Sequence, residues 1–278
     1  MTNSVQPSVI TYTADISICS QICRLAVQEH HLQNAEDVHV DIEYAMDNYE
    51  PWFVRIQPSM TVPVMKYNNE YIGDSKDILY FLVDKYPEAG LYPEGARSEI
   101  DQFIDDFYNN FRWIGIFTFG NLQSQGETMK QFINIGKTEV TLRKLRALVD
   151  DPELGETISA KLEQVEQRDF AQLADPGLIA KTDQQITALL ARLEQKLSDG
   201  RTFVAGSAYT LADVVATALL ARVHFIKQEE LFTPTLKAYW QRVKARPSFK
   251  TANICATWES TLMSKQYAEF LQSSDNAQ

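Results

Sequence analysis

The sequence predicts an α/β domain at the N-terminal end and an all-helical domain after it. In residues 9–86, short runs rich in β-branched and aromatic residues alternate with segments whose apolar residues recur at helical spacing. Two prolines then fall within residues 87–93, which is typical of a linker because proline interrupts regular structure. Every later segment has a helical pattern. We therefore assign a linker to residues 87–97, the helical domain to 98–265 and a polar tail to 266–278.

The first domain is predicted to contain four strands and three helices. The strands are indicated by β-branched and aromatic residues, and the helices by apolar faces and capping residues. Asn68-Asn69 separates the last two strands and is typical of a hairpin turn. The predicted order is strand 9–13, helix 17–30, strand 38–41, irregular helix 44–55, strand 62–65, strand 70–72 and helix 75–85.

The start of the helical domain carries a capping pattern. Ser98 and Asp101 have the spacing at which two side chains cap the first turn of a helix reciprocally, so we expect a helix to open at Ser98. The segments that follow share apolar residues at helical spacing. They are an aromatic helix at 111–119 that stops at Gly120-Asn121, a charged pair of segments at 129–149 and 152–173, and a helix that starts at Asp175-Pro176.

A second capping pattern stands near the end of the helical domain. Thr210 and Asp213 have the same spacing, and Tyr209 and Val214 flank them at the positions of a hydrophobic staple. The helix that follows, residues 214–225, is almost wholly apolar. A helix that is apolar on all sides is buried, so this one is predicted to run through the centre of the domain.

Composition narrows the classes of function. The formal net charge is -11, which disfavours binding to nucleic acid or to an anionic lipid surface. No stretch approaches the roughly 20 apolar residues of a membrane span. Three cysteines are too few for a disulfide framework and favour a cytosolic protein with reduced thiols. The four histidines show no metal-ligand spacing, so no metal site is predicted.

The segment around Val62-Pro63 and Asp74-Ser75 predicts a small binding site. A proline inside strand-like sequence removes a backbone donor, and a cis peptide at the start of the strand would leave neighbouring backbone groups free for a ligand. Ser75 then lies in the first turn of a helix capped by Asp74, where free N–H groups bind anions. Together these features indicate a pocket for an extended peptide with a carboxylate. The alternative is a buried hairpin and an ordinary capped helix.

Ser17 and Cys19 stand where the first strand feeds into the first helix. A thiol at a helix N-terminus has a lowered pKa and is more nucleophilic, so Cys19 is predicted to be reactive. The alternative is that Cys19 is a small buried apolar residue. Cys23 lies one turn deeper and is predicted to fill the core, as is Cys255.

These motifs resemble the glutathione transferase family. Closer similarity points to the branch of the tetrachlorohydroquinone reductive dehalogenase and the ganglioside-induced differentiation-associated proteins, which also carry a long insertion like that at 126–176. The segments that carry the resemblance are Ile16-Ser17-Ile18-Cys19-Ser20, Val40-Asp41-Ile42, Asn48-Tyr49-Glu50-Pro51, Val62-Pro63, Phe203-Val204-Ala205-Gly206-Ser207, Leu219-Leu220-Ala221-Arg222 and Lys244-Ala245-Arg246.

The resemblance implies a thioredoxin-like fold for the first domain and glutathione as cosubstrate. It implies that Val62, Pro63, Asp74 and Ser75 bind glutathione. Ser17 would activate the glutathione thiol, and Cys19 would attack the sulfur of a glutathionyl conjugate.

A second pocket is expected beside the thiol for a small hydrophobic electrophile. The candidates for its lining are Tyr108, Phe111, Phe117 and Phe119, although each could instead belong to the core. Phe107 is assigned to the core.

The sequence therefore predicts a cytosolic glutathione transferase, expected to be a homodimer. Its reaction would be conjugation of small electrophilic or aromatic substrates, or reductive deglutathionylation and dehalogenation through Cys19. The alternative is a non-catalytic binding or scaffold protein that keeps the fold.

Overall fold

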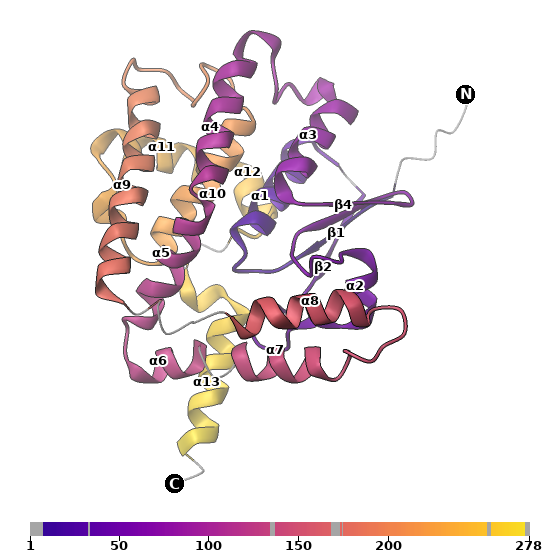
Figure 1. The fold of residues 1–278 in the computed structure, drawn as a ribbon. Helices are drawn as coiled ribbons and strands as arrows, with labels where there is room; N and C mark the ends of the chain where they lie inside the picture. The colour runs from indigo at the N-terminus through magenta and orange to yellow at the C-terminus, as the bar shows by residue number, and fades with distance from the viewer. Residues whose placement is uncertain are drawn as a thin grey trace.

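The computed structural model describes residues 8–32, 34–133, 137–167, 173, 175–254 and 257–275 (Figure 1). A four-stranded sheet occupies the N-terminal part, and helices make up the rest of the described chain. Cys255, assigned to the core above, lies outside the described residues.

The sheet has the order β2-β1-β3-β4 and confirms the predicted sequence of elements. Strand β1 pairs in parallel with β2 and antiparallel with β3, which in turn pairs antiparallel with β4. The strands are β1 (Val9–Thr13), β2 (Ala35–His39), β3 (Val64–Tyr67) and β4 (Glu70–Gly73).

Strand β2 begins three residues earlier than predicted and ends before Val40. The first residues of β2 include the acidic pair Glu36 and Asp37, which have low β-propensity. Propensity therefore favoured residues 38–41 instead. The shift has a tertiary cause: β2 is an edge strand, and the hydroxyls of Thr11 and Thr13 on β1 donate to the Asp37 carboxylate at 2.6 and 2.8 Å. These bonds place a charged residue inside the strand.

Helices cover both faces of the sheet. On one face α1 (Ile18–Glu29) and α3 (Ser75–Lys85) share a core with Val9 and Met65. On the other face α2 (Pro51–Ile56), which follows the short 3-10 helix η1 (Asp47–Tyr49), packs Phe53 against Val64. Because Val64 and Met65 are neighbours in one strand, they point to opposite faces and serve the two cores separately.

The remaining helices form the second part of the chain (Figure 1). Short 3-10 turns, η2 (Pro87–Ala89) and η3 (Glu94–Ala96), lead into it. Its helices are α4 (Arg97–Asn109), α5 (Phe111–Gln123), α6 (Glu127–Gln131), α7 (Lys137–Arg146), α8 (Gly155–Glu166), α9 (Pro176–Leu197), α10 (Leu211–Phe225), α11 (Pro234–Lys244), α12 (Pro247–Thr251) and α13 (Leu262–Asp275).

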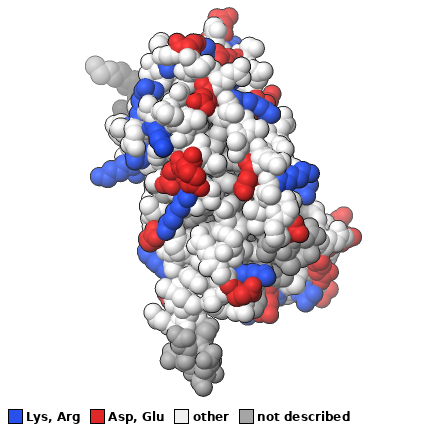
Figure 2. Space-filling model, turned by 90° about the vertical axis from the view of Figure 1, so that its left-hand side faces the viewer, with Lys and Arg blue, Asp and Glu red and all other residues white. Residues whose placement is uncertain are grey.

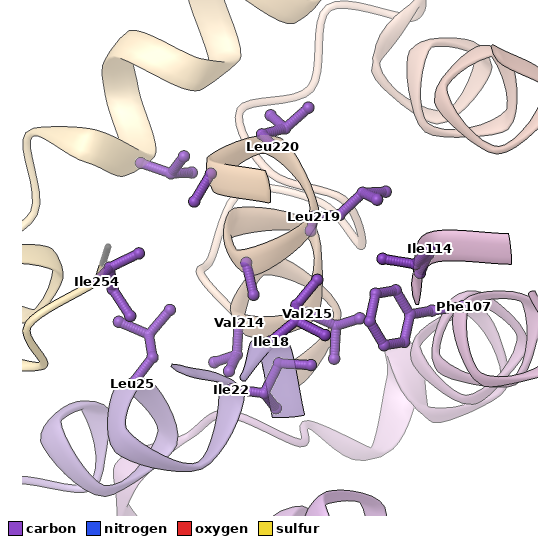
Figure 3. Close-up of a cluster of buried hydrophobic side chains, with 14 of the residues drawn as sticks. Ile18, Ile22, Leu25, Phe107, Ile114, Val214, Val215, Leu219, Leu220 and Ile254 are labelled. Carbon is purple, nitrogen blue, oxygen red and sulfur yellow. The ribbon is translucent and has the colours of Figure 1, made fainter. Parts of the chain in front are cut away.

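Helix α10 runs through the centre, as its apolar sequence predicted. Its side chains meet residues of α1, α4 and α5 in one buried cluster (Figure 3). The predicted capping box at its start is confirmed: Thr210 caps the first turn, and the Asp213 carboxylate accepts from the Thr210 N–H at 2.9 Å. Asp213 is fully buried there.

Two other expectations were wrong. Helix α4 begins at Arg97 without a side-chain cap, because Asp101 instead accepts from the hydroxyls of Tyr80 and Tyr92 at 2.6 and 2.9 Å. Helix α5 continues past Gly120 to Gln123, since a glycine inside a buried helix is tolerated when packing supports it. Part of the predicted polar tail, residues 266–275, belongs to α13, which ends at Asp275.

The surface of the described residues is mixed in charge. Figure 2 shows the side of the molecule on the left of Figure 1, where acidic and basic side chains are interspersed. Among the described residues, none of the helices is long and apolar enough to cross a membrane.

Candidate functional site

Ser17 caps the N-terminus of α1. Its backbone is extended, and its side-chain oxygen accepts from the Ser20 N–H at 3.2 Å. Because this bond uses the oxygen as an acceptor, the O–H of Ser17 is still available as a donor. A thiolate bound in front of the helix would accept this donor and would be stabilised by it.

The loop before Ser17 is held by Arg222 of α10. The buried guanidinium donates to the carbonyl oxygen of Ile16 and, at 3.1 Å, to the hydroxyl of Thr118 on α5. The central helix therefore positions the loop that carries Ser17. Sequence reasoning missed this role, although an arginine inside an almost wholly apolar helix was a signal that could have found it.

The Val62-Pro63 peptide bond is cis, as predicted. The segment before it is fixed by Met60, whose backbone lies in the left-handed region with φ 58° and whose carbonyl accepts from the Asn48 side chain at 2.8 Å. The side chain of Met60 is buried, so its packing stabilises the residue in this left-handed backbone conformation.

A cavity of about 290 Å³ lies between Ser17 and the Met60-Thr61-Val62 segment. It is bounded by the N-terminus of α1, by η1, and by helices α5, α7 and α8. Its wall combines apolar side chains with a few polar groups. The lining residues are Ser17, Ile42, Met46, Asn48, Tyr49, Met60, Thr61, Val62, Phe119, Thr141, Lys161 and Val165.

The Cys19 thiol does not have the predicted low pKa. Burial raises the pKa of the Cys19 thiol to about 12, and this outweighs the lowering effect of a hydrogen bond with Ser75. Cys19 is partly buried, and the cost of desolvating its thiolate exceeds the stabilisation that the helix end gives. Cys23 is completely buried in the core, as predicted.

Ser75 and Tyr108 meet at the boundary between the two parts of the chain. Their hydroxyl oxygens are 2.6 Å apart, and Ser75 is only 1% exposed. Asp74 caps α3 by accepting from the Lys76 N–H at 2.8 Å, as predicted. Ser75, Tyr108 and Cys19 thus form one polar cluster. None of the three is among the described residues that line the Ser17 cavity.

The four aromatic residues predicted to line the second pocket lie in different parts of the structure. Phe119 lines the Ser17 cavity, and Tyr108 contacts Ser75. Phe117 is 2% exposed and lies in the main core, because residues 117 and 119 point away from each other on α5. Phe111 is 39% exposed and packs beside the buried Phe107. Phe117 and Phe111 are therefore not part of the lining of this cavity.

Comparison with known proteins agrees with this arrangement. Residues 16–85 match the family model of the glutathione S-transferase N-terminal domain, and residues 176–247 match that of its C-terminal domain. The chain is also 30% identical over 258 residues to a tetrachloro-p-hydroquinone reductive dehalogenase from Sphingobium chlorophenolicum, covering 91% of this chain and 98% of that relative. The chain belongs to the glutathione transferase family.

Other members of the family extend the comparison. The glutathione S-transferase TCHQD of Arabidopsis thaliana is 25% identical, over 86% of this chain and 87% of its own length. The crystal structure of the β-etherase LigF from Sphingobium sp. strain SYK-6 shares the fold, with a TM-score of 0.65 and 20% identity over 88% of this chain and 98% of the other. As a member of this enzyme family, the transferase uses glutathione as its cosubstrate.

Proposed function

We propose that this transferase conjugates glutathione to small electrophilic or aromatic substrates in the Ser17 cavity. The observation that carries the proposal is the available O–H of Ser17, which faces the same cavity as Val62. A donor aimed at a thiolate lowers the pKa of the thiol and holds the nucleophile in place. The apolar part of the wall, with Phe119, suits an aromatic substrate.

Glutathione would lie across the N-terminal domain, residues 9–86, with the helical domain, residues 98–265, supplying the other wall. In this proposal Val62 and Pro63 pair with its backbone, while Asp74 and Ser75 bind its γ-glutamyl end. The contact between Ser75 and Tyr108 supports the idea that the Ser75 hydroxyl exchanges partners when a carboxylate arrives.

The test is turnover of 1-chloro-2,4-dinitrobenzene with glutathione. Ser17→Ala is expected to lower kcat/KM by about 10²-fold, the loss typical when one donor to a developing or bound anion is removed. Ser20→Ala is a matched control, since it removes a hydroxyl one turn away that faces Ala14 rather than the cavity. No turnover by the wild type would favour the alternative of a non-catalytic scaffold protein.

Reduction through Cys19 is a second candidate function, favoured by the reductive dehalogenase relative. The Cys19 thiolate would attack the sulfur of a glutathionyl aryl conjugate, giving a Cys19–glutathione disulfide and releasing the aryl group, which takes a proton. A second glutathione thiolate would then attack this disulfide and leave as glutathione disulfide. Glutathione is oxidised and the aryl carbon is reduced. Because the pKa of Cys19 is raised, a ligand must first favour its ionisation.

Intact-mass measurement separates the two functions. After exposure to a glutathionyl conjugate, the wild type is expected to gain one glutathione, and Cys19→Ser is expected to gain none while retaining conjugation. Modification of the Cys19→Ser variant to the same extent would show that Cys19 is structural.

We also propose a cytoplasmic homodimer. Exposed aromatic side chains on both parts of the chain support a contact between the N-terminal domain of one subunit and the helical domain of the other. They are Trp52, Tyr71 and Phe111. Light scattering at micromolar concentration is expected to give twice the chain mass of 31.7 kDa, and a mass of one chain would contradict the proposal.

A further inference from the structure

The insertion that forms α7 and α8 packs against the N-terminal domain. Its apolar side chains join those of η1, α2 and Met60 in a core separate from the main one. The insertion and the N-terminal domain each contribute buried residues to this second core. They are Leu145, Leu154, Ile158 and Val165 from the insertion and Met46, Tyr49, Val54 and Met60 from the N-terminal domain.

Polar contacts fix the insertion in the same place. Lys144 on α7 forms an ion pair with Glu50, and Glu153 accepts from Arg55 on α2 at 2.9 Å. Lys161 on α8 donates to the carbonyl oxygen of Ser59 at 2.8 Å. Ser59 immediately precedes the Met60-Thr61-Val62 segment, so the position of Lys161 relative to the cavity is set by packing and hydrogen bonding together.

Lys161 brings a positive charge to the edge of the cavity, where its ammonium group donates to the Ser59 carbonyl oxygen. It lines the cavity together with Ser17, and among the described lining residues it is the one with a formal charge. The carboxylate of Glu156 belongs to the neighbouring hollow, which Lys161 also lines, and not to the described lining of the Ser17 cavity. The chain as a whole carries a net charge of -11, so a cationic lining is not a consequence of general composition.

This arrangement has a chemical consequence for the second substrate. An ammonium group next to an apolar wall recognises a molecule that combines an aromatic body with an anionic oxygen, because both parts find complementary partners. We propose that Lys161 selects aromatic electrophiles that carry a carboxylate or phenolate oxygen. The inference rests on the proposed function of the Ser17 cavity and names the substrate class of that site.

Paired substrates test the proposal. The anionic 4-chloro-3,5-dinitrobenzoate and the neutral 1-chloro-2,4-dinitrobenzene both react with glutathione by loss of chloride. In Lys161→Gln, kcat/KM for the benzoate is expected to fall about tenfold or more, the loss typical of one charge-assisted hydrogen bond. The value for the neutral substrate is expected to stay within about twofold. Lys161→Arg keeps the charge and is expected to retain most of the preference.

The matched control is Lys237→Gln, which removes a lysine from the exposed surface of α11. An equal loss for the benzoate in this control would show that only the net charge matters and would overturn the proposal. So would an equal loss for both substrates in Lys161→Gln, which would assign Lys161 a structural role through Ser59.

A binding measurement separates this inference from the proposed function. Calorimetry with the unreactive 3,5-dinitrobenzoate and 1,3-dinitrobenzene is carried out on glutathione-loaded protein. Weaker binding of the benzoate alone in Lys161→Gln supports the inference even if the wild type turns over neither chlorinated substrate, a result that would refute only the proposed catalysis. Unchanged benzoate affinity in Lys161→Gln would overturn the inference whatever the turnover.

Discussion

Replacement of Asp213 tests the polar centre of the helical domain. The carboxylate is fully buried and accepts four hydrogen bonds. The donors are the Val204 N–H at 2.8 Å, the Thr210 N–H and hydroxyl, both at 2.9 Å, and the Tyr239 hydroxyl at 2.7 Å. It thus joins the start of α10 to the preceding loop and to α11, which is more than an ordinary helix cap does.

The expected cost follows from this count. Asp213→Ala leaves the donors buried without an acceptor, and four bonds at about 1 kcal/mol each predict a loss of about 4 kcal/mol of unfolding free energy. An ordinary N-terminal cap contributes about 1 kcal/mol. Asp213→Asn keeps one acceptor oxygen and is expected to cost about 2 kcal/mol, while Tyr239→Phe removes one donor and is expected to cost about 1 kcal/mol.

Urea unfolding of the three variants measures this order. The activity of each folded variant is expected to stay near that of the wild type, because Asp213 lies outside the lining of the Ser17 cavity. If Asp213→Ala costs no more than Tyr239→Phe, the carboxylate is not the shared acceptor. A large loss of turnover at unchanged stability would assign Asp213 to the active site instead.

The same carboxylate makes stability depend on pH. Burial raises the pKa of Asp213 from 3.8 to about 6, against the lowering effect of its hydrogen bonds. Because the folded pKa is the higher one, the folded state binds more protons between pH 4 and 6. The contribution of the group is therefore fully present below about pH 4 and is lost as the pH rises through 6. The stability of the wild type relative to Asp213→Asn is expected to fall across that window.

Three further variants probe the interfaces. Arg222→Met leaves two buried acceptors without a donor and is expected to cost about 2–4 kcal/mol in urea unfolding, whereas an unchanged midpoint would show that the loop is held by other contacts. Leu145→Ala empties part of the second core, with an expected cost of about 2–5 kcal/mol, and hydrogen exchange should rise first in α7 and α8 rather than throughout the chain. Ser75→Ala is expected to weaken glutathione binding by about 1.5–3 kcal/mol in calorimetry, while Tyr108→Phe, its control, is expected not to weaken it. Equal losses in both would mean that the pair is structural.

Local signals predicted much of the fold. The bounds of α3, the capping of α1 by Ser17 and the box at Thr210 all follow from side chains within one helical turn of one another. Such contacts are encoded in spacing, so they can be found without knowing the rest of the structure.

Long-range contacts were harder to predict. Asp101 has the right spacing for a cap, but two tyrosines from other segments take its oxygens. The pKa of Cys19 depends on its burial and on neighbours such as Ser75 and Arg222, which its position at a helix end does not reveal. The charged insertion gave no sign that it would pack on η1 and α2 and bring Lys161 to the cavity. Each of these outcomes depends on partners distant in sequence.

Arg222 makes the position of Ser17 depend on the helical part of the chain. The sheet and its helices contain Ser17, but the loop before it is tied to α10 and α5, which lie at the middle of the other half of the chain. A chain still emerging from the ribosome, or one whose helical half has melted, would therefore present the serine on a loosely held loop. Under the proposed function, activity would therefore require that both parts of the chain are folded and packed together.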